Sequence, residues 1–523
     1  MNLNRKLWWA QHKSNVYKYG TILSLVLIVT ISIIYFTYSK FTSKNEATAY
    51  ETTVEPFIKN DYFIASYIDG EWSDSIPGKS DGYVVDKVVC DNGATGTWDN
   101  TDWGINIRNA TKKTKCSVYF ETKKYTDNVI AKAPKLAQGM IPVKFDASGN
   151  VVVADTSSKW YDYEAHEWAN AVLVNCADSA IKSKYFDSNN KVLASAVGKT
   201  ISMKEIMQMY VYIPRYKYQL FNAEDGTSVE QAINITFESK TTAKSTGTKN
   251  GEWLTHPAFT FGDKELAGIW VGKFETSNTK ALPKIVPNVG SLRRMTASAQ
   301  FNTSRLMTTT LVSAYGTSTN DDSHMMKNME WGAVAYLSSS IYGRYTSAST
   351  CIESGCEIWI NNNQKYTTGC AGSSVSASEA STCNAWNTAT GVNASTTGNI
   401  YGIYDMSGGA FERVMGNYND TIDYSGFSSM PEAKYYDKYT GTESNSDFTK
   451  YYLGDATKET VKTKSSGSNS WYGDANYSVY SSGPWVIRGG GYYDSTGAGV
   501  FQFHISGGST DDPSSFRVVF DAL

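Results

Sequence analysis

The chain has 523 residues, which is enough for two to four domains and a large hydrophobic core. Its formal net charge of −3 excludes the strongly basic surface typical of nucleic-acid binding, and it indicates no strong attraction to a membrane surface. Only 19% of the residues are charged, while 36 are tyrosines. This balance is typical of a β-rich exported protein.

An uncharged, apolar segment over 19–39 has the length of a transmembrane helix. The residues before it carry no acid and four basic side chains, at Arg5, Lys6, Lys13 and Lys18. Residues 1–18 are therefore predicted to form a cytoplasmic tail, and the protein to cross the cell membrane once with its C-terminal bulk extracellular. A cleaved signal peptide is the alternative, but Ala47-Thr48-Ala49, the candidate cleavage site, lies far beyond the apolar run.

All seven cysteines follow the apolar segment, at Cys90, Cys116, Cys176, Cys351, Cys356, Cys370 and Cys383. Disulfides persist in oxidising compartments, so we expect several of these cysteines to be paired. Cys-x-x-Cys spacing is absent, and the chain has only five histidines. These features exclude the usual zinc-binding motifs.

Residues 51–122 are predicted to form a small β-sandwich. GYVVDKVVC (82–90) and CSVYFET (116–122) carry β-branched and aromatic residues at strand spacing, and a Cys90–Cys116 disulfide would stabilise so small a module. Trp98 and Trp103 are expected to fill its core. The segment resembles immunoglobulin-like repeats of Gram-positive surface proteins; such a module is either adhesive or a spacer, and the buried tryptophans favour a spacer.

Residues 123–136 read as a linker, and 137–523 as one large domain. Its first part, 139–174, is predicted to contain three strands. A capping box at Ser202–Glu205 predicts a short helix ending at Met209, and apolar residues at helical spacing predict another over His324–Ser338. His166 is expected to be exposed, and Cys176 to be a buried structural cysteine.

Residues 339–398 form a Ser-, Thr-, Asn- and Gly-rich insertion with four cysteines. Such a loop buries little apolar surface, so two disulfides are expected to hold it. Four cysteines allow three connectivities. The favoured one closes CIESGC through Cys351–Cys356 and leaves Cys370 with Cys383.

Five motifs of the large domain occur in the order found in one known family. They are YIPRYKY (212–218), GIWVGKFETS (268–277), NMEWGAVAYL (328–337), GNIYGIYDMSGGAFERVMGNY (398–418) and PWVIRGGGYYD (484–494) with SSFRVVF (514–520). This pattern resembles the formylglycine-generating-enzyme-like, or sulfatase-modifying-factor, branch of the C-type lectin fold. The resemblance implies an α+β fold class: a C-type-lectin-like domain preceded by the transmembrane helix and the β-sandwich.

The resemblance also implies two sites. In relatives with diversified sequences, the segment matching 492–515 is the ligand surface, so we expect Tyr492, Tyr493, Asp494, Phe503, His504 and Asp511 to contact a ligand. The family's calcium loop matches Gly408, Gly409, Ala410 and Glu412, which makes a structural Ca²⁺ bound by Gly408, Ala410 and Glu412 one interpretation. A pair between Glu412 and a buried arginine, such as Arg413 or Arg488, is the other.

The family's oxidases hold copper with a cysteine pair after the RGG motif, but this chain has no cysteine after Cys383. Whether the protein is an enzyme stays open, and the missing pair favours a protein without catalytic activity. We expect a membrane-anchored extracellular binding protein, or adhesin, that recognises a glycan or protein ligand. The alternatives are an extracellular enzyme of the same family with altered chemistry and a structural component of a surface assembly.

Overall fold

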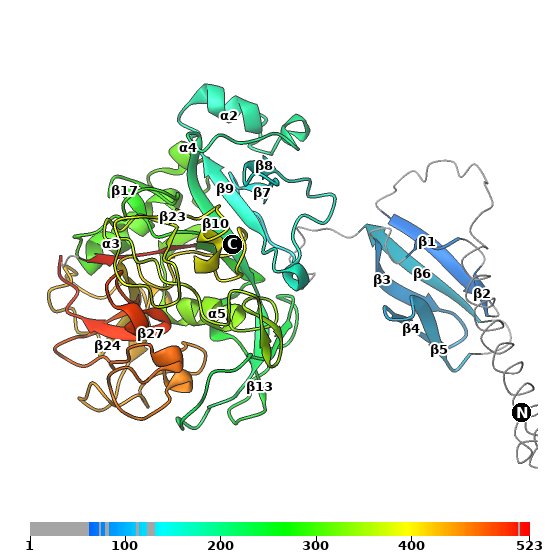
Figure 1. Ribbon diagram of the computed structural model, residues 1–523. Coiled ribbons are helices and arrows are strands. Elements are labelled where there is room, and N and C mark those ends of the chain that lie inside the picture. The colour runs from blue at the N-terminus through cyan, green and yellow to red at the C-terminus, as the bar shows by residue number, and fades with distance from the viewer. Residues whose placement is uncertain are drawn as a thin grey trace, which may run out of the picture. The chain divides into compact units, whose positions relative to one another are not determined.

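The computed structural model describes residues 62–68, 70–72, 75–78, 83–110, 114–122, 131–510 and 513–523. The chain divides into two compact units, Met1–Thr122 and Lys123–Leu523 (Figure 1). The finer division into 51–122, 123–136 and 137–523 stays a prediction.

The described part of the first unit is a four-stranded antiparallel sheet and a separate hairpin. The sheet has the order β2-β1-β6-β3, and β4 and β5 form the hairpin. Trp98 of β4 and Trp103 both pack against Phe120 of β6, so these tryptophans fill the core of the unit. Cys90 and Cys116 lie opposite each other in the β3–β6 ladder and form a disulfide. The strands are β1 (Tyr62–Ile68), β2 (Glu71–Trp72), β3 (Tyr83–Cys90), β4 (Thr95–Asp99), β5 (Gly104–Arg108) and β6 (Lys115–Thr122).

The second unit contains a seven-stranded antiparallel sheet of order β19-β29-β16-β10-β9-β7-β8. Its central strand, β10, is buried at all nine positions because neighbouring elements cover both faces. The last strand of the chain, β29, inserts between β16 and β19. The strands are β7 (Ile141–Phe145), β8 (Val151–Val153), β9 (Asn170–Val174), β10 (Ile206–Pro214), β16 (Gly268–Gly272), β19 (Asp322–Met325) and β29 (Val518–Asp521).

A second sheet has the order β25-β24-β26-β27, with β28 beside β24, and contains the strands from which the candidate site is built. Glu412 of β24 lies opposite Arg488 of β26, so the segments 398–418 and 484–494 belong to one sheet. Its strands are β24 (Phe411–Tyr418), β25 (Asp437–Tyr439), β26 (Trp485–Gly489), β27 (Gly499–Ser506) and β28 (Ser514–Ser515).

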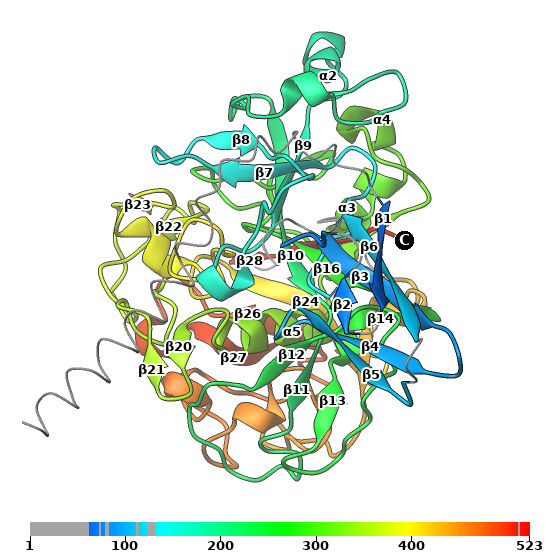
Figure 2. The same ribbon diagram turned by 90° about the vertical axis from the view of Figure 1, so that its right-hand side faces the viewer.

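Short strand pairs and triplets complete the unit. They are β11 (Tyr216–Gln219), β12 (Ile235–Phe237) and β13 (Trp253–Thr255); β14 (Thr260–Phe261) and β15 (Lys264–Glu265); β17 (Ser277–Thr279) and β18 (Leu282–Lys284); β20 (Tyr345–Ser347) and β21 (Thr350–Cys351); and β22 (Cys370–Ala371) and β23 (Asn384–Ala385). In Figure 2, β7–β9 lie at one end of the unit and β11–β13 at the other.

Helix α5 (Asn328–Ser338) is buried along its whole length and links several strands. Trp331 donates its indole N–H to the Val500 carbonyl of β27, and Tyr216 of β11 donates its hydroxyl to the Ala333 carbonyl. The other α-helices of the described residues are α2 (Ser179–Tyr185), α3 (Ala297–Ser304) and α4 (Val312–Tyr315), and the further helical segments are short 3-10 helices. The predicted helix over His324–Ser338 therefore begins at Asn328, because His324 belongs to β19.

The predicted α+β class is wrong. Strands hold 32% of the residues and helices 13%, so the protein is mostly β. The helix predicted from the capping box at Ser202–Glu205 illustrates the reason. The chain instead enters β10 at Ile206, where β-branched and aromatic side chains pair with β9 and β16, and this tertiary pairing outweighs the local helix signal.

The predicted tail over 1–18 and transmembrane helix over 19–39 lie outside the described residues. Within the described part of the chain, no helix combines the length and the apolar character needed to cross a bilayer. We therefore correct the predicted single-pass location in the cell membrane, because the structure gives it no support.

Gly332 of α5 allows the helix to lie directly on the loop at 454–455. A Cβ at this position would come within 1.9 Å of the Gly454 carbonyl oxygen. Because the contacting atoms are backbone, they cannot move aside without distorting the loop. Gly332→Ala is therefore expected to lower the free energy of unfolding by about 2–4 kcal/mol in urea titrations. Gly290→Ala is the control, because its nearest heavy atom would be 4.0 Å away. An unchanged midpoint for Gly332→Ala would contradict this close contact.

Candidate functional site: an aromatic row and its pocket

The turn between β26 and β27 brings residues 490–498 to the end of the second sheet. Gly490 adopts a φ of +77°, and a Cβ there would meet Ala498 at 2.6 Å. The turn can therefore fold tightly over the short helix Ser495–Gly497 only with glycine at this position. As a result, the tyrosines that follow Gly491 stand at the edge of the sheet.

Five side chains from four separate segments form a continuous row, which we call the aromatic row. The guanidinium carbon of Arg293 lies 3.6 Å from the ring centroid of Tyr366. The ring centroids of Tyr366 and Tyr492 are 4.9 Å apart, as are those of Tyr492 and Tyr493. Tyr493 contacts Phe411 at 6.1 Å and is 47% exposed. The row thus offers flat apolar faces, hydroxyls and one cation at the surface.

Phe411 also lines an adjoining cavity of about 380 Å³, which we call the recognition pocket. Its volume falls in the range of small-ligand sites, about 300–1,000 Å³. The apolar wall includes Ile487 of β26 and Ile505 of β27. Tyr477 contributes a ring that packs 4.2 Å from the ring centroid of His504. The pocket is therefore a hydrophobic continuation of the aromatic row.

The polar side chains that line this pocket include Asp494, Gln502 and His504. The Oε1 atom of Gln502 is buried and has no hydrogen-bond partner among the described residues, although the residue is only 1% exposed. Burying an acceptor without a donor costs about 1–3 kcal/mol. A ligand that places an O–H or N–H at this atom would remove that cost.

Burial shifts the pKa of Asp494 and that of His504. It raises the pKa of the Asp494 carboxyl, which accepts a 2.9 Å hydrogen bond from the Gly491 N–H. It lowers the pKa of His504, whose Nδ1 accepts from the Ile505 N–H at 2.9 Å. The imidazole is therefore neutral at pH 7, and the pocket carries one carboxylate with no basic side chain among its described lining residues.

Of the six residues predicted to contact a ligand, four lie at the surface described above. Tyr492 and Tyr493 belong to the aromatic row, and Asp494 and His504 line the pocket. Phe503 is fully buried between Phe448 and Tyr451, so it belongs to the core. Asp511 lies outside the described residues.

Besides Phe411, which lies in a motif quoted without a site role, the sequence analysis missed Arg293, Tyr366, Tyr477 and Gln502. Gln502 carried a usable signal, because alternate residues of a strand face the same side and Gln502 precedes His504 by two positions. The other three come from loops that only the tertiary fold brings together.

No protein-family model matches the chain, and no curated protein matches it. Several solved structures are weakly similar, and two of them serve as examples. One is Treponema denticola variable protein 1, with 11% identity, coverage of 61% of this chain and 98% of that one, and a TM-score of 0.22. The other is the Major Tropism Determinant I1 Variant, with 11% identity, coverage of 82% and 95%, and a TM-score of 0.25.

Both proteins are adhesins with a C-type-lectin-like fold. The comparisons give no support for the sulfatase-modifying-factor family. Similarity at such TM-scores carries no argument about function.

The predicted calcium ligands have other partners. Both carboxylate oxygens of Glu412 accept hydrogen bonds from the guanidinium of Arg517, at 2.9 Å from Nε and more closely from Nη2. Both side chains are fully buried. The partner is thus neither Arg413 nor Arg488. A cation at Glu412 would meet this guanidinium, so the donor set of Gly408, Ala410 and Glu412 does not fit Ca²⁺ in this arrangement.

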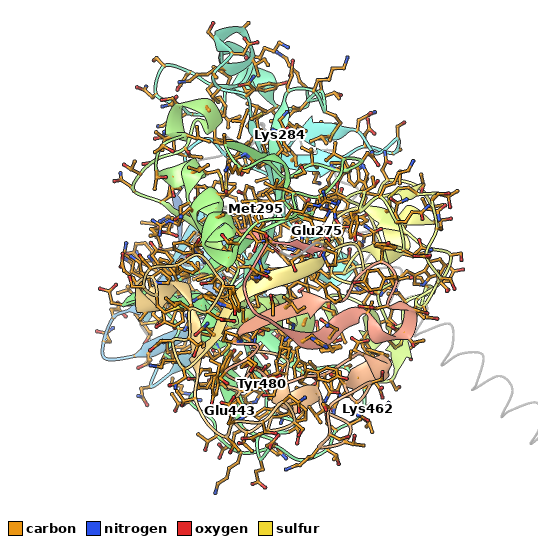
Figure 3. The ribbon with its side chains drawn as sticks, turned by 90° about the vertical axis from the view of Figure 1, so that its left-hand side faces the viewer. Glu275, Lys284, Met295, Glu443, Lys462 and Tyr480 are labelled. Carbon is orange, nitrogen blue, oxygen red and sulfur yellow. A yellow bond between two sulfur atoms is a disulfide. The ribbon has the colours of Figure 1, made fainter. Side chains whose placement is uncertain are left out.

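A second buried carboxylate, Glu275, which is labelled in Figure 3, contacts the loop that contains Gly408, Gly409 and Ala410. Its Oε1 accepts the Ala410 N–H at 2.9 Å, and Ser291 donates its hydroxyl to Oε2. Burial, followed by the charges of Asp405 and Glu412, raises the pKa of Glu275 far above its usual range. A Cβ on Gly409 would approach Glu275 Oε1 to 2.5 Å. The buried carboxyl therefore leaves no room for a side chain at Gly409.

The cysteines of the second unit are structural. Disulfides join Cys351 to Cys356 and Cys370 to Cys383, which are the pairs named from the sequence. Cys176 is a buried free thiol whose pKa burial raises, so it is a poor nucleophile. Within the described residues no group of three or more His, Cys, Asp or Glu side chains is arranged to hold a metal ion.

Proposed function

We propose that the protein is a binding protein, or adhesin, that recognises a ligand through the aromatic row and the recognition pocket. The residues of this surface are tyrosines and an arginine beside a small apolar cavity, a composition typical of antibody paratopes and of protein-interface hot spots. Of the glycan and protein ligands expected from the sequence, this composition favours a protein.

The observation that carries the proposal is the continuity of the row with the pocket through Phe411. The row provides contact area with little loss of side-chain freedom, because each ring is already held by its neighbour. The pocket can then take one side chain of the ligand, with a donor directed at Gln502 Oε1.

The C-type-lectin-like framework that the sequence resemblance implies, and the absence of a cysteine pair after the RGG motif, support the same proposal. The framework presents its loops on a rigid sheet, which suits recognition. Cys383 is the last cysteine of the chain, so the oxidase chemistry of the sulfatase-modifying-factor family has no thiol pair in this region.

The test uses the labelled full chain against a panel of purified extracellular proteins and intact cells. For any partner bound by the wild type, Tyr492→Ala/Tyr493→Ala is expected to raise Kd about 100-fold or more, because hot-spot tyrosines each contribute about 2 kcal/mol. Surface plasmon resonance measures this change.

Tyr452→Ala is the matched control, since Tyr452 is 45% exposed and lies on another part of the unit. Its binding should equal that of the wild type. Equal loss in both variants, or no loss in the double variant, would contradict a binding role for the aromatic row.

A further inference from the structure

The insertion at 339–398 encloses a cavity of its own, which we call the insertion pocket. The pocket has a volume of about 620 Å³, and no residue lines both it and the recognition pocket. Ile352, Glu353 and Ser354 of the CIESGC loop form part of its wall, together with Trp359. His166, from a distant part of the sequence, completes it.

A buried arginine joins two segments that contribute to this wall. Arg344 is fully buried, and its guanidinium donates to backbone carbonyls of 355–357 and of 393–395. The acceptors are Gly355 at 3.1 Å, Glu357 at 2.6 Å, and Asn393 and Ser395 at 3.2 Å each. With the Cys351–Cys356 disulfide closing the loop, the pocket is preformed and does not require ordering on binding.

The lining combines one large ring with neutral polar groups. Trp359 is half-buried, and its indole N–H donates to the Ser354 carbonyl at 3.1 Å, which fixes the ring against the loop. Asn393 provides an amide and Ser354 a hydroxyl, and neither side chain has a hydrogen-bond partner among the described residues. Glu353 is exposed and adds one carboxylate.

The pocket carries no positive charge at neutral pH. None of its described lining residues is lysine or arginine. Burial lowers the pKa of His166, whose Nε2 lies 3.2 Å from the Ile341 carbonyl oxygen. A phosphate, sulfate or carboxylate ligand would find no counter-charge here, so an anionic ligand is disfavoured.

We propose that the insertion pocket is a second binding site, for an uncharged saccharide. A sugar ring has an apolar face that can stack on Trp359 and hydroxyls that match amides, hydroxyls and a carboxylate. The volume leaves room for more than one sugar residue. This site goes beyond the proposed function, because it shares no residue with the aromatic row.

The test screens the full chain on an array of neutral, sialylated and sulfated glycans, and then titrates the best neutral trisaccharide by calorimetry. Binding of neutral glycans is expected. Trp359→Ala should raise Kd about tenfold or more, whereas Trp359→Phe, which keeps a ring, should stay within about threefold. Asn393→Ala should also weaken binding, and its fold is protected because its side chain makes no internal hydrogen bond.

Trp253→Ala is the matched control, because Trp253 is also half-buried but lies on β13. It should bind as the wild type does. The Tyr492→Ala/Tyr493→Ala variant should keep saccharide binding. A failure of the insertion-pocket proposal can therefore be distinguished from a failure of the proposed function of the aromatic row. Binding of no glycan, a preference for anionic glycans, or wild-type affinity in Trp359→Ala would overturn the proposal.

Discussion

Replacing Arg517 by methionine is expected to lower the free energy of unfolding by about 3–5 kcal/mol, because Glu412 would lose its partner while staying buried. Arg517 also donates to the Gly272 carbonyl at 2.7 Å and to the Tyr404 carbonyl at 2.9 Å. The side chain therefore joins β16, the loop before β24 and β24 itself. Urea titration with intrinsic fluorescence measures the change.

The double variant Arg517→Met/Glu412→Leu distinguishes the charge from the packing. Apolar residues of similar volume can replace a buried ion pair at little cost. The double variant should therefore recover much of the loss, although the two carbonyls stay unpaired. A double variant less stable than Arg517→Met would show that the pair itself is not the source of the effect.

That the 398–418 and 484–494 segments belong to one folding unit could be predicted from the sequence, because the motifs follow one another in a recognisable order. The 398–418 and 484–494 segments were expected together, and β24 and β26 do pair through Glu412 and Arg488. The pairing of the four cysteines in the insertion could also be predicted, since the two disulfides join the cysteines that are closest in sequence. Such features depend on local spacing.

The partners of buried charges could not be predicted. A pair between Glu412 and a buried arginine was one of two interpretations, with Arg413 and Arg488 as examples. Instead, Arg413 donates to Gln300 Oε1 at 2.8 Å and Arg488 to Asn328 Oδ1 at 3.2 Å. Arg517, more than 100 positions away in sequence, takes the carboxylate instead. Several buried arginines compete for one acid, and only the packing of two sheets decides among them.

The helical content was overestimated for a related reason. The capping box at 202–205 is a local signal, whereas β10 is stabilised by two neighbouring strands and full burial. Strand alternation, in contrast, was an unused signal. In β27, Phe501 and Phe503 enter the core while Gln502 and His504 line the pocket, so the period of two would have separated Phe503 from the ligand contacts.

Raising the pH from 6.5 to 10 is expected to cost on the order of 4 kcal/mol of stability through His324 alone. Burial lowers the pKa of this histidine, but Glu330 and Asp322 outweigh burial and raise it to about 10. The ring bonds Asp322 Oδ1 at 2.9 Å and Glu330 Oε1 at 3.0 Å. The protonated ring thus joins β19 to the first turn of α5.

The sign of this pH effect on stability follows from the pKa values of His324 in the unfolded and folded states. The unfolded histidine titrates near 6.5, so below that pH both states are protonated and the stabilisation is complete. Between 6.5 and about 10 only the folded state keeps the proton, and the stabilisation falls with each pH unit. Asp521, whose pKa burial raises to about 7, changes stability in the same direction from pH 4 to 7.

His324→Gln isolates this contribution, because glutamine does not titrate. Urea midpoints measured at pH 6, 8 and 10 should fall steeply in the wild type and much less in the variant. The variant should also be less stable at pH 6, where Glu330 and Asp322 lose their cation. Parallel pH profiles for the two proteins would mean that His324 is not protonated in the folded state, and that α5 is held to β19 by neutral hydrogen bonds.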